Sequence, residues 1–190
     1  ISRMRAVEWR EYIKDFCDMI RTLNRLAKPV IAAINGVTVG GGCDIAMACD
    51  IRIASEKAKF GYGYIKMGII SDLGGSYFLP RIIGPGRAKL FAFSGDIIDA
   101  KEAERIGFVD KLVSDEEFSS AVEELVRKIA NGPTSAIIMV KEAMRRSSTM
   151  DLDASLDYST NLQSSLIDTE DIKEGINSFL EKRKPNYKGI

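Results

Sequence analysis

One segment constrains the fold more than any other, because an apolar run, three consecutive glycines, a short apolar stretch and a second apolar run follow one another within residues 30–54. The runs Val30–Ile34 and Ile51–Ala54 are rich in β-branched residues, so each predicts a buried strand. The stretch Cys43–Cys49 suits a short buried helix that begins at Gly40–Gly42. A strand, a helix and a strand in so short a span predict an α/β crossover unit.

The rest of the chain continues this pattern and then changes. Residues 6–26 carry apolar side chains at spacings of mostly three and four, which predicts an amphipathic helix. Further predicted elements are a short extended piece at 59–64, helices at 76–83, 87–93 and 100–106 (the last capped by Asp99), and a strand at 108–113. Four helical segments without an intervening strand follow, at 115–130, 134–146, 151–166 and 169–183. We therefore predict an α/β core over 1–113 and a helical region over 114–190 that packs around it or against another subunit.

Composition excludes several classes of function. The 27 Lys and Arg residues balance the 27 Asp and Glu residues, so no overall field draws the chain to nucleic acid, and no apolar stretch approaches the length of a membrane span. The absence of histidine excludes Ser-His-Asp and Cys-His catalytic systems and most zinc sites. The three cysteines lack metal-ligand spacing, and no secretory signal is visible at the N-terminus, so we expect no metal and a cytoplasmic setting.

The glycine segment Asn35–Ala46 is the first candidate for chemistry. It places glycines where a strand passes into a helix N-terminus, and the unpaired N–H groups there can bind a ligand oxygen such as a thioester oxyanion. The alternative is a tight turn that only serves helix–strand packing. Neither a phosphate-binding loop nor a dinucleotide-binding fingerprint fits the glycine spacing.

Two acidic residues could act as a base beside these glycines. Asp44 lies in an otherwise apolar helix start, where burial should affect its protonation, although an acid in a first helical turn needs no function. Asp72 lies in an apolar, glycine-rich loop at 68–75, where capping the next helix is its alternative role and Ser71 competes for it. A carboxylate near a thioester could remove a proton from an acyl chain while backbone N–H groups hold the enolate, and this chemistry needs no histidine.

These residues also match, in order, a pattern typical of one family. The matching segments are Lys28–Gly36, Gly40–Ala46, Cys49–Ser55, Ala58–Gly61, Gly68–Pro80, Ser94–Asp96, Ala100–Val113 and Glu174–Pro185. They resemble the crotonase superfamily, the enoyl-CoA hydratase/isomerase family, over essentially the whole chain. The resemblance implies an α/β fold with a crotonase-like ββα spiral core followed by an all-helical C-terminal oligomerisation region. It also implies that the family's usual N-terminal segment, with its first strands and a second oxyanion-hole loop, is missing from this chain.

The resemblance assigns roles to individual residues. Gly41 would donate an oxyanion-hole N–H to the thioester carbonyl, Gly40 would contact substrate, and Asp44 takes the position of the first catalytic glutamate of hydratases. Tyr64 takes the position of their second glutamate, where a phenol is a poor substitute for a carboxylate acting on water. Asp72 falls where dienoyl-CoA isomerases of the family carry a catalytic aspartate. The resemblance therefore favours double-bond isomerisation of an unsaturated acyl-CoA, catalysed by Asp72 with Asp44.

The resemblance also indicates partners. Phe179 and Lys182 would help to bind the CoA adenine and phosphates, whereas the basic residues here could equally form an ordinary solvated helix end. Family members assemble as trimers or paired trimers, so we expect a homotrimer or a dimer of trimers. CoA would be part of the substrate, with no other cofactor and a place in fatty acid metabolism such as β-oxidation.

Two other functions remain open at this point. One is an enoyl-CoA hydratase that adds water to a 2-enoyl-CoA, and the test is whether the product gains the mass of water. The other is a non-catalytic relative that binds acyl-CoA or RNA. The balanced charge and the lack of interleaved basic and aromatic residues disfavour RNA.

Overall fold

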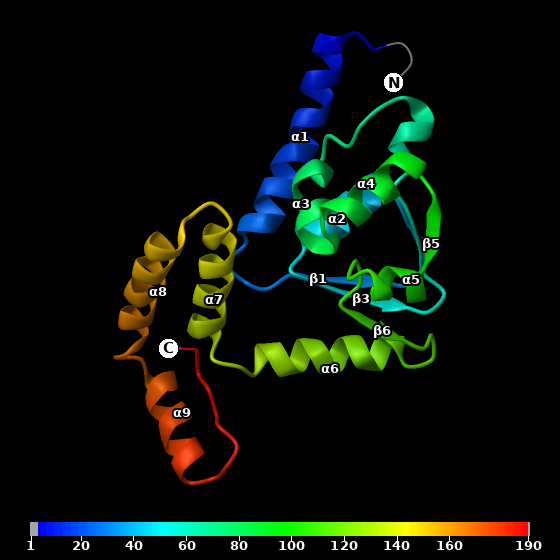
Figure 1. The fold of residues 1–190 in the computed structure, drawn as a ribbon. Coiled ribbons are helices and arrows are strands. Elements are labelled where there is room, and N and C mark those ends of the chain that lie inside the picture. The colour runs from blue at the N-terminus through cyan, green and yellow to red at the C-terminus, as the bar shows by residue number, and fades with distance from the viewer. Residues whose placement is uncertain (1–3, 190) are drawn as a thin grey trace. The chain divides into compact units, whose positions relative to one another are not determined.

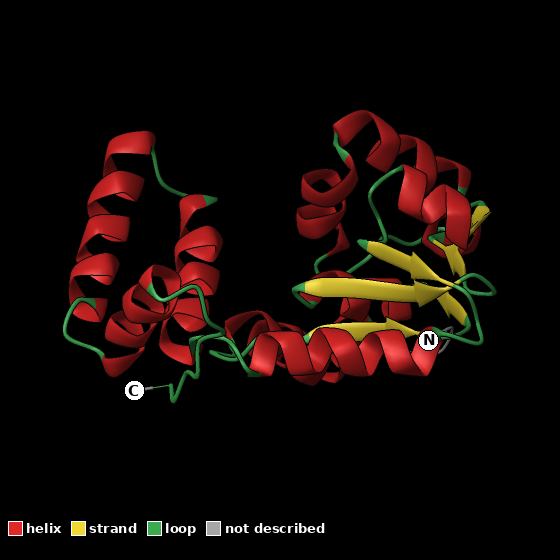
Figure 2. Ribbon diagram, turned by 90° about the horizontal axis from the view of Figure 1, so that it is seen from below, coloured by secondary structure: helices red, strands yellow, loops and turns green. Residues whose placement is uncertain are grey.

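The computed structural model describes residues 4–189, which form two compact units. The first unit comprises the described residues up to Leu26 together with Val30–Val122, and the second comprises Ala27–Pro29 and the described residues from Glu123 onward. The strands of the described chain all belong to the first unit (Figures 1 and 2).

The strands of the first unit form two small sheets. In one, β1 (Ile31–Ile34), β3 (Ile51–Ser55) and β6 (Lys111–Val113) run parallel in the order β1–β3–β6. In the other, β4 (Lys59–Gly61) lies between β2 (Val37–Val39), to which it is parallel, and β5 (Ile97–Asp99), to which it is antiparallel. The parallel neighbours β1 and β3 are joined through a segment that contains helix α2 (Gly41–Ala48), so the predicted crossover unit is confirmed.

Helices cover these sheets and enclose the main core. They are α3 (Gly75–Ile83), α4 (Pro85–Ser94) and α5 (Ala100–Arg105), together with the short 3₁₀ helix η1 (Gly63–Met67). Phe60 and Phe108 are fully buried with ring centroids 5.2 Å apart, and Phe91 packs against Phe108 at 6.3 Å. Burying a side chain of this size stabilises the fold by about 1.5–3 kcal/mol. The core therefore fixes β4 and α4, the elements that flank the tyrosines described below.

Helix α1 (Ala6–Arg25) joins this unit through a smaller apolar cluster. Ile20 is buried against Ala48 of α2 and Leu73 of the loop before α3, and Ile13 and Cys17 pack beside them. Of the apolar residues predicted over 6–26, Ile13, Met19, Ile20 and Leu23 pack in this cluster beside the loop carrying Asp72, whereas Val7, Tyr12 and Phe16 are exposed.

Helices alone make up the regular structure of the second unit in its described residues. These are the C-terminal part of α6 (Phe118–Ala130), α7 (Thr134–Ser147), α8 (Leu152–Leu166) and α9 (Glu170–Leu180). The chain after α9 is fixed by the buried Asp171, whose carboxylate accepts the backbone N–H groups of Lys188 at 2.7 Å and Gly189 at 2.9 Å. Because the fold here has no strand, the prediction of an all-helical last third is confirmed.

Two predicted elements were partly wrong, and one of them is the strand expected at 108–113, which is a strand only over Lys111–Val113. The extended piece expected at 59–64 ends at Gly61, and Gly63–Met67 forms the helix η1 instead. Tyr62 and Tyr64 nevertheless both donate their hydroxyl protons to the carboxylate of Asp44. The short strands β2 and β5 were not predicted from the sequence.

Candidate active site

The site begins where β2 passes into α2. Gly40 lies immediately before the helix with φ +51°, a conformation that favours glycine, and its N–H donates to the carbonyl of Gly61 at 2.9 Å. Gly41 and Gly42 form the start of the helix, so their N–H groups have no acceptor within it. A Cβ on Gly40 would lie 3.6 Å from the ring of Tyr64, and one on Gly41 would lie 3.8 Å from its hydroxyl. The predicted oxyanion donor Gly41 therefore lies beside Tyr64.

The side chain of Asp44, one turn further along α2, is fully buried and surrounded by hydroxyl groups. Its Oδ1 accepts from Tyr62 Oη at 3.0 Å, and its Oδ2 accepts from Tyr64 Oη at 2.6 Å and from Ser71 Oγ at 2.9 Å. Burial raises the pKa of Asp44, an effect that these hydrogen bonds oppose and the charge of Asp72 reinforces. Burial and hydrogen bonding therefore shift the pKa of Asp44 in opposite directions, and burial has the larger effect.

The groups around Asp44 stay protonated. Burial raises the pKa of the Tyr62 and Tyr64 phenols well above the ordinary value, and the neighbouring Asp44 adds to both shifts. Burial likewise raises the pKa of the Cys43 thiol to about 12. The thiol and the two phenols are therefore weaker acids than their ordinary counterparts.

Helix α3 packs tightly onto the hydroxyl cluster. The N–H of Gly75 donates to Ser71 Oγ at 3.0 Å, which orients the serine hydroxyl proton towards Asp44. A Cβ on Gly75 would lie 1.4 Å from Tyr62 Oη, 2.6 Å from Asp44 Oδ1 and 2.7 Å from Ser71 Oγ. Glycine at this position is therefore a requirement of the cluster.

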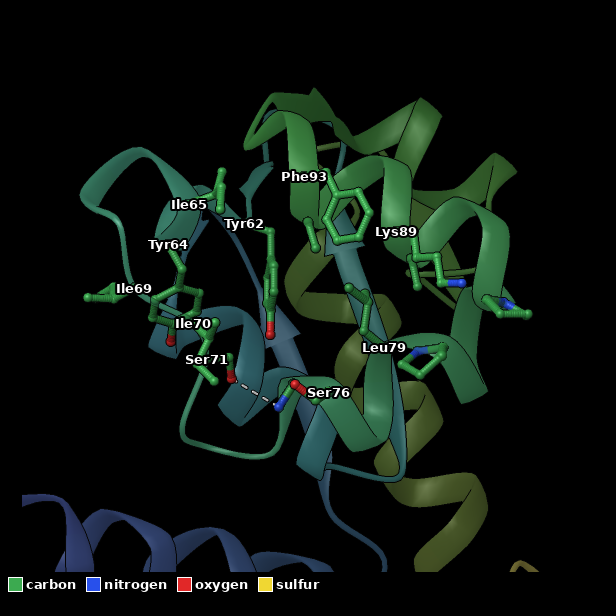
Figure 3. A pocket seen from close by; sticks show the side chains of 15 residues that line it. Tyr62, Tyr64, Ile65, Ile69, Ile70, Ser71, Ser76, Leu79, Lys89 and Phe93 are labelled. Carbon is green, nitrogen blue, oxygen red and sulfur yellow. Dashed lines mark hydrogen bonds between the residues drawn. The ribbon is translucent and has the colours of Figure 1, made fainter. Parts of the chain in front are cut away.

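An apolar pocket of about 320 Å³ lies on one side of the cluster. Figure 3 shows the hydroxyls of Tyr62, Tyr64 and Ser71 together at one end of this pocket and Phe93 towards the other. Its apolar lining comes from η1, the loop after it, α3 and α4, including Ile65, Ile69, Leu79, Ala88 and Phe93. Asp44 does not line the pocket, because the three hydroxyls lie between its carboxyl group and the space. The pocket suits an apolar chain with a reactive group at its polar end.

Asp72 lines a second hollow, which shares Ile69 and Ile70 with the first. This hollow, of about 470 Å³, is lined by Met4, Trp9, Gly68, Ile69, Ile70 and Asp72. The indole Nε1–H of Trp9 donates to Asp72 Oδ2 at 3.0 Å, and the Cys17 thiol donates to the Asp72 carbonyl at 3.4 Å. Asp72 therefore does not cap α3, the alternative role considered for it, and Ser71 receives the N–H of Gly75.

The structure brings most of the predicted site residues into one region. Gly40, Gly41, Asp44 and Tyr64 are in contact, and the charge of Asp72 is near enough to raise the pKa of Asp44. The contributions of Tyr62, Gly75 and Trp9 were missed by sequence analysis, which considered Ser71 only as a cap for the next helix.

The two predicted CoA contacts belong to the second unit. Phe179 lies on α9 with 83% of its surface exposed, and Lys182 follows the helix with φ +53°. A large exposed aromatic ring is free to meet a ligand, but the fold places these residues in a different compact unit from Gly41 and Asp44. Their role in CoA binding remains a prediction.

Two further properties of residues 4–189 bear on the class of protein. No group of three or more Cys, Asp or Glu side chains in this range is arranged to hold a metal ion. None of the helices described is long and apolar enough to cross a membrane.

Comparison with known proteins supplies the context for this geometry. The family model described as enoyl-CoA hydratase/isomerase matches residues 3–190. A crotonyl-CoA hydratase of Syntrophomonas wolfei is 38% identical over 98% of this chain and 72% of its own length, and a 1,2-epoxyphenylacetyl-CoA isomerase of Escherichia coli is 37% identical over 90% of this chain and 65% of its own. The crystal structure of an enoyl-CoA hydratase from Bacillus anthracis superposes with a TM-score of 0.94 at 36% identity, covering 100% of this chain and 73% of that one.

Proposed function

Because the chain belongs to the enoyl-CoA hydratase/isomerase family, a family of enzymes, we propose that it moves the double bond of an unsaturated acyl-CoA. The observation that carries this proposal is the separation of the acidic groups. Asp44 is enclosed by three hydroxyls, Tyr64 stands beside Gly41, and Asp72 lies in a hollow of its own. The hydratases that this chain resembles carry two glutamates, whereas double-bond migration needs proton transfer at two different carbons.

The backbone at the start of α2 would supply the electrostatic part of catalysis. The N–H of Gly41 would donate to the thioester oxygen and stabilise the negative charge that develops there when a proton leaves the acyl chain. Gly40 would let the thioester approach the backbone without a Cβ in the way. The second lone pair of the thioester oxygen would need a hydrogen-bond donor other than Gly40 and Gly41.

Asp72 would remove the proton. It is an acid held in a fixed orientation by Trp9 Nε1, and a carboxylate with an N–H donor on one oxygen keeps the other oxygen for a substrate proton. Delivery of a proton at the other end of the dienolate completes the shift of the double bond. The net change moves one proton and two π electrons, so the proposed reaction requires no metal or redox cofactor.

The rest of the substrate would follow from family resemblance. The CoA moiety would be met by Phe179 and Lys182, with Lys182 opposite a phosphate and Phe179 against the adenine. We also propose assembly into a homotrimer or a dimer of trimers through the helical region 114–190, and a cytoplasmic location.

Hydration is the second candidate function, and two observations favour it. The S. wolfei relative is named a crotonyl-CoA hydratase, and Asp44, at the position of a hydratase glutamate, has a pKa raised by burial as a general acid requires. In that case Asp44 would need a second group to activate water.

One experiment separates the two candidates. The protein is incubated separately with a 2-enoyl-CoA and a 3-enoyl-CoA, and product mass and double-bond position are followed together by mass spectrometry and NMR. Unchanged mass with a moved double bond supports isomerisation. Gain of one water without migration refutes it and establishes hydration.

A further inference from the structure

The carboxyl group of Asp44 cannot itself reach a substrate in this structure. Its side chain has no exposed surface, and its oxygens are enclosed by the hydroxyls of Tyr62, Tyr64 and Ser71. All three of those residues line the apolar pocket, whereas Asp44 does not (Figure 3). Any proton that Asp44 gives to a ligand in the pocket must therefore pass through one of the hydroxyls.

Tyr64 is the hydroxyl best placed for this transfer. Its contact with Asp44 is the shortest of the three, at 2.6 Å, and its side chain is half-buried rather than fully buried. Its hydroxyl lies 3.8 Å from where a Cβ of Gly41 would be, next to the N–H predicted to hold the thioester oxygen. It is therefore close to the carbon bonded to the thioester carbonyl.

The other two hydroxyls are committed to positions in the cluster. Ser71 Oγ accepts the N–H of Gly75 and donates to Asp44, so both of its functions are used. Tyr62 has only 5% of its surface exposed, and its hydroxyl fits against Gly75 so closely that a Cβ there would overlap it. These two donors hold the Asp44 carboxyl group in place.

We propose that Tyr64 is the catalytic residue that exchanges a proton with the α-carbon of the acyl chain, and that Asp44 is a positioning residue that supplies this proton through the Tyr64 phenol. The inference rests on the proposed function and assigns the second proton transfer of that reaction. Asp72 takes the γ-proton of a 2-enoyl-CoA and leaves a dienolate at Gly41. The Tyr64 O–H proton then bonds to the α-carbon while the Asp44 O–H proton moves to the Tyr64 oxygen.

Every proton in this step is accounted for. The dienolate gains one proton and becomes a 3-enoyl-CoA, Tyr64 ends as it began, and Asp44 ends as a carboxylate with hydrogen bonds from Tyr62, Tyr64 and Ser71. Asp72 ends protonated, and exchange of both acids with solvent restores the starting state. No oxidant, reductant or further reactant takes part.

Burial shifts Asp44 towards its acid form, against the three hydrogen bonds it accepts, which favour the carboxylate. Burial and the nearby charge of Asp72 both raise the pKa of Asp44, while the Cys43 thiol beside it has a pKa of about 12 and does not compete as an acid. When Asp72 becomes protonated in the first half of the reaction, one of these two influences is removed, so Asp44 releases its proton more readily.

Deuterium labelling tests this transfer of a proton from Asp44 through Tyr64 to the α-carbon, which we call the relay. In D₂O, transfer from Asp44 through Tyr64 places solvent deuterium on the α-carbon of the 3-enoyl-CoA product. A single base that carries one proton between the two carbons would retain the original hydrogen. Exchange of the α-protons of saturated butanoyl-CoA with D₂O, followed by NMR, reports the same Tyr64 transfer without any migration of a double bond.

The variants Tyr64→Phe and Asp44→Asn are compared with wild type, with Tyr12→Phe on the exposed face of α1 as the matched control. We expect both site variants to lose at least about 100-fold in migration rate and in butanoyl-CoA exchange, the usual contribution of general acid–base catalysis, while KM changes little. The control should keep both rates. Thermal unfolding confirms that each variant is folded.

The outcomes distinguish the relay from the proposed function. If wild type exchanges the α-protons of butanoyl-CoA and Tyr64→Phe does not, the relay holds even where no double bond moves, and only the isomerase assignment fails. If folded Tyr64→Phe keeps wild-type exchange and α-deuterium incorporation, the relay is refuted. Wild type that catalyses neither reaction refutes both.

Discussion

Replacing Gly75 with alanine tests whether the hydroxyl cluster is as tightly built as the structure indicates. The added Cβ would lie 1.4 Å from Tyr62 Oη, 2.6 Å from Asp44 Oδ1 and 2.7 Å from Ser71 Oγ. No relaxed contact between such atoms is this short, so at least the tyrosine must move. The backbone conformation itself is no obstacle, because Gly75 does not have a positive φ.

The expected cost can be worked from these contacts. Overpacking a buried site costs about 1–3 kcal/mol. Displacing Tyr62 from Asp44 leaves a buried hydrogen-bonding group unpaired, which costs about 1–3 kcal/mol more. The better helix propensity of alanine returns at most about 1 kcal/mol. We therefore expect a net loss of about 1–6 kcal/mol in the free energy of unfolding.

Urea denaturation measures this difference, and Gly86→Ala is the control. Gly86 also lies in the first turn of a helix, α4, but a Cβ there would meet nothing within 4 Å. This substitution should be neutral or stabilise the protein by up to about 1 kcal/mol. A Gly75→Ala protein as stable as Gly86→Ala would refute the close packing of α3 on the cluster.

Three further predictions concern Trp9, Asp44 and Asp110 of the first unit. Trp9→Phe removes the N–H donor to Asp72 and should lower kcat about 10-fold to 100-fold with little change in KM. If steady-state kinetics give this variant the kcat of wild type, Trp9 does not orient the carboxylate. Asp44→Asn should gain stability relative to wild type as the pH rises above about 3.9, the unfolded-state pKa of an aspartate. The reason is that folding raises the pKa of Asp44, so wild type loses stability between its unfolded-state and its folded-state pKa. Parallel pH dependences of the two proteins in urea titrations would contradict this. Asp110→Ala leaves the guanidinium of the 6%-exposed Arg52 without its carboxylate and should cost about 1.5–3 kcal/mol in urea unfolding, whereas a loss below 0.5 kcal/mol would show that the backbone acceptors suffice.

Much of the fold followed from patterns that depend only on local sequence. The glycine-bounded helix α2, the strands β1 and β3 and the long helices α1, α7 and α8 lie close to their predicted positions, because periodicity and turn residues are strong in these segments. The fold as a whole is the α/β core with a helical C-terminal region that the crotonase resemblance implied. Strands β2 and β5 were missed because three-residue strands carry too little pattern to recognise.

Only those site residues that belong to a continuous sequence motif could be predicted. Gly41 and Asp44 belong to one continuous segment, so the sequence placed them together. Trp9 lies 63 residues before Asp72, and nothing on its own helix marks it as a donor to a distant carboxylate. Gly75 resembled an ordinary loop glycine, because the hydroxyl of Tyr62 that it accommodates comes from a different element. Contacts between elements are set by tertiary packing, which one sequence does not reveal.

The enclosure of Asp44 changes how its position in the family pattern is interpreted. An acid that is fully buried behind hydroxyls is suited to storing a proton, while the part-buried Asp72 in its open hollow is suited to taking one. Asp44 and Asp72 would then have distinct roles that are set by their surroundings rather than by their residue type.

The most direct test of this account is the rate of double-bond migration by Asp72→Asn, measured with the unsaturated acyl-CoA that wild type converts. Asparagine keeps the size of the side chain and an oxygen to accept the Trp9 N–H, but it cannot take a proton. The account predicts a loss of at least about 100-fold in kcat with KM nearly unchanged. Turnover at the wild-type rate would contradict it.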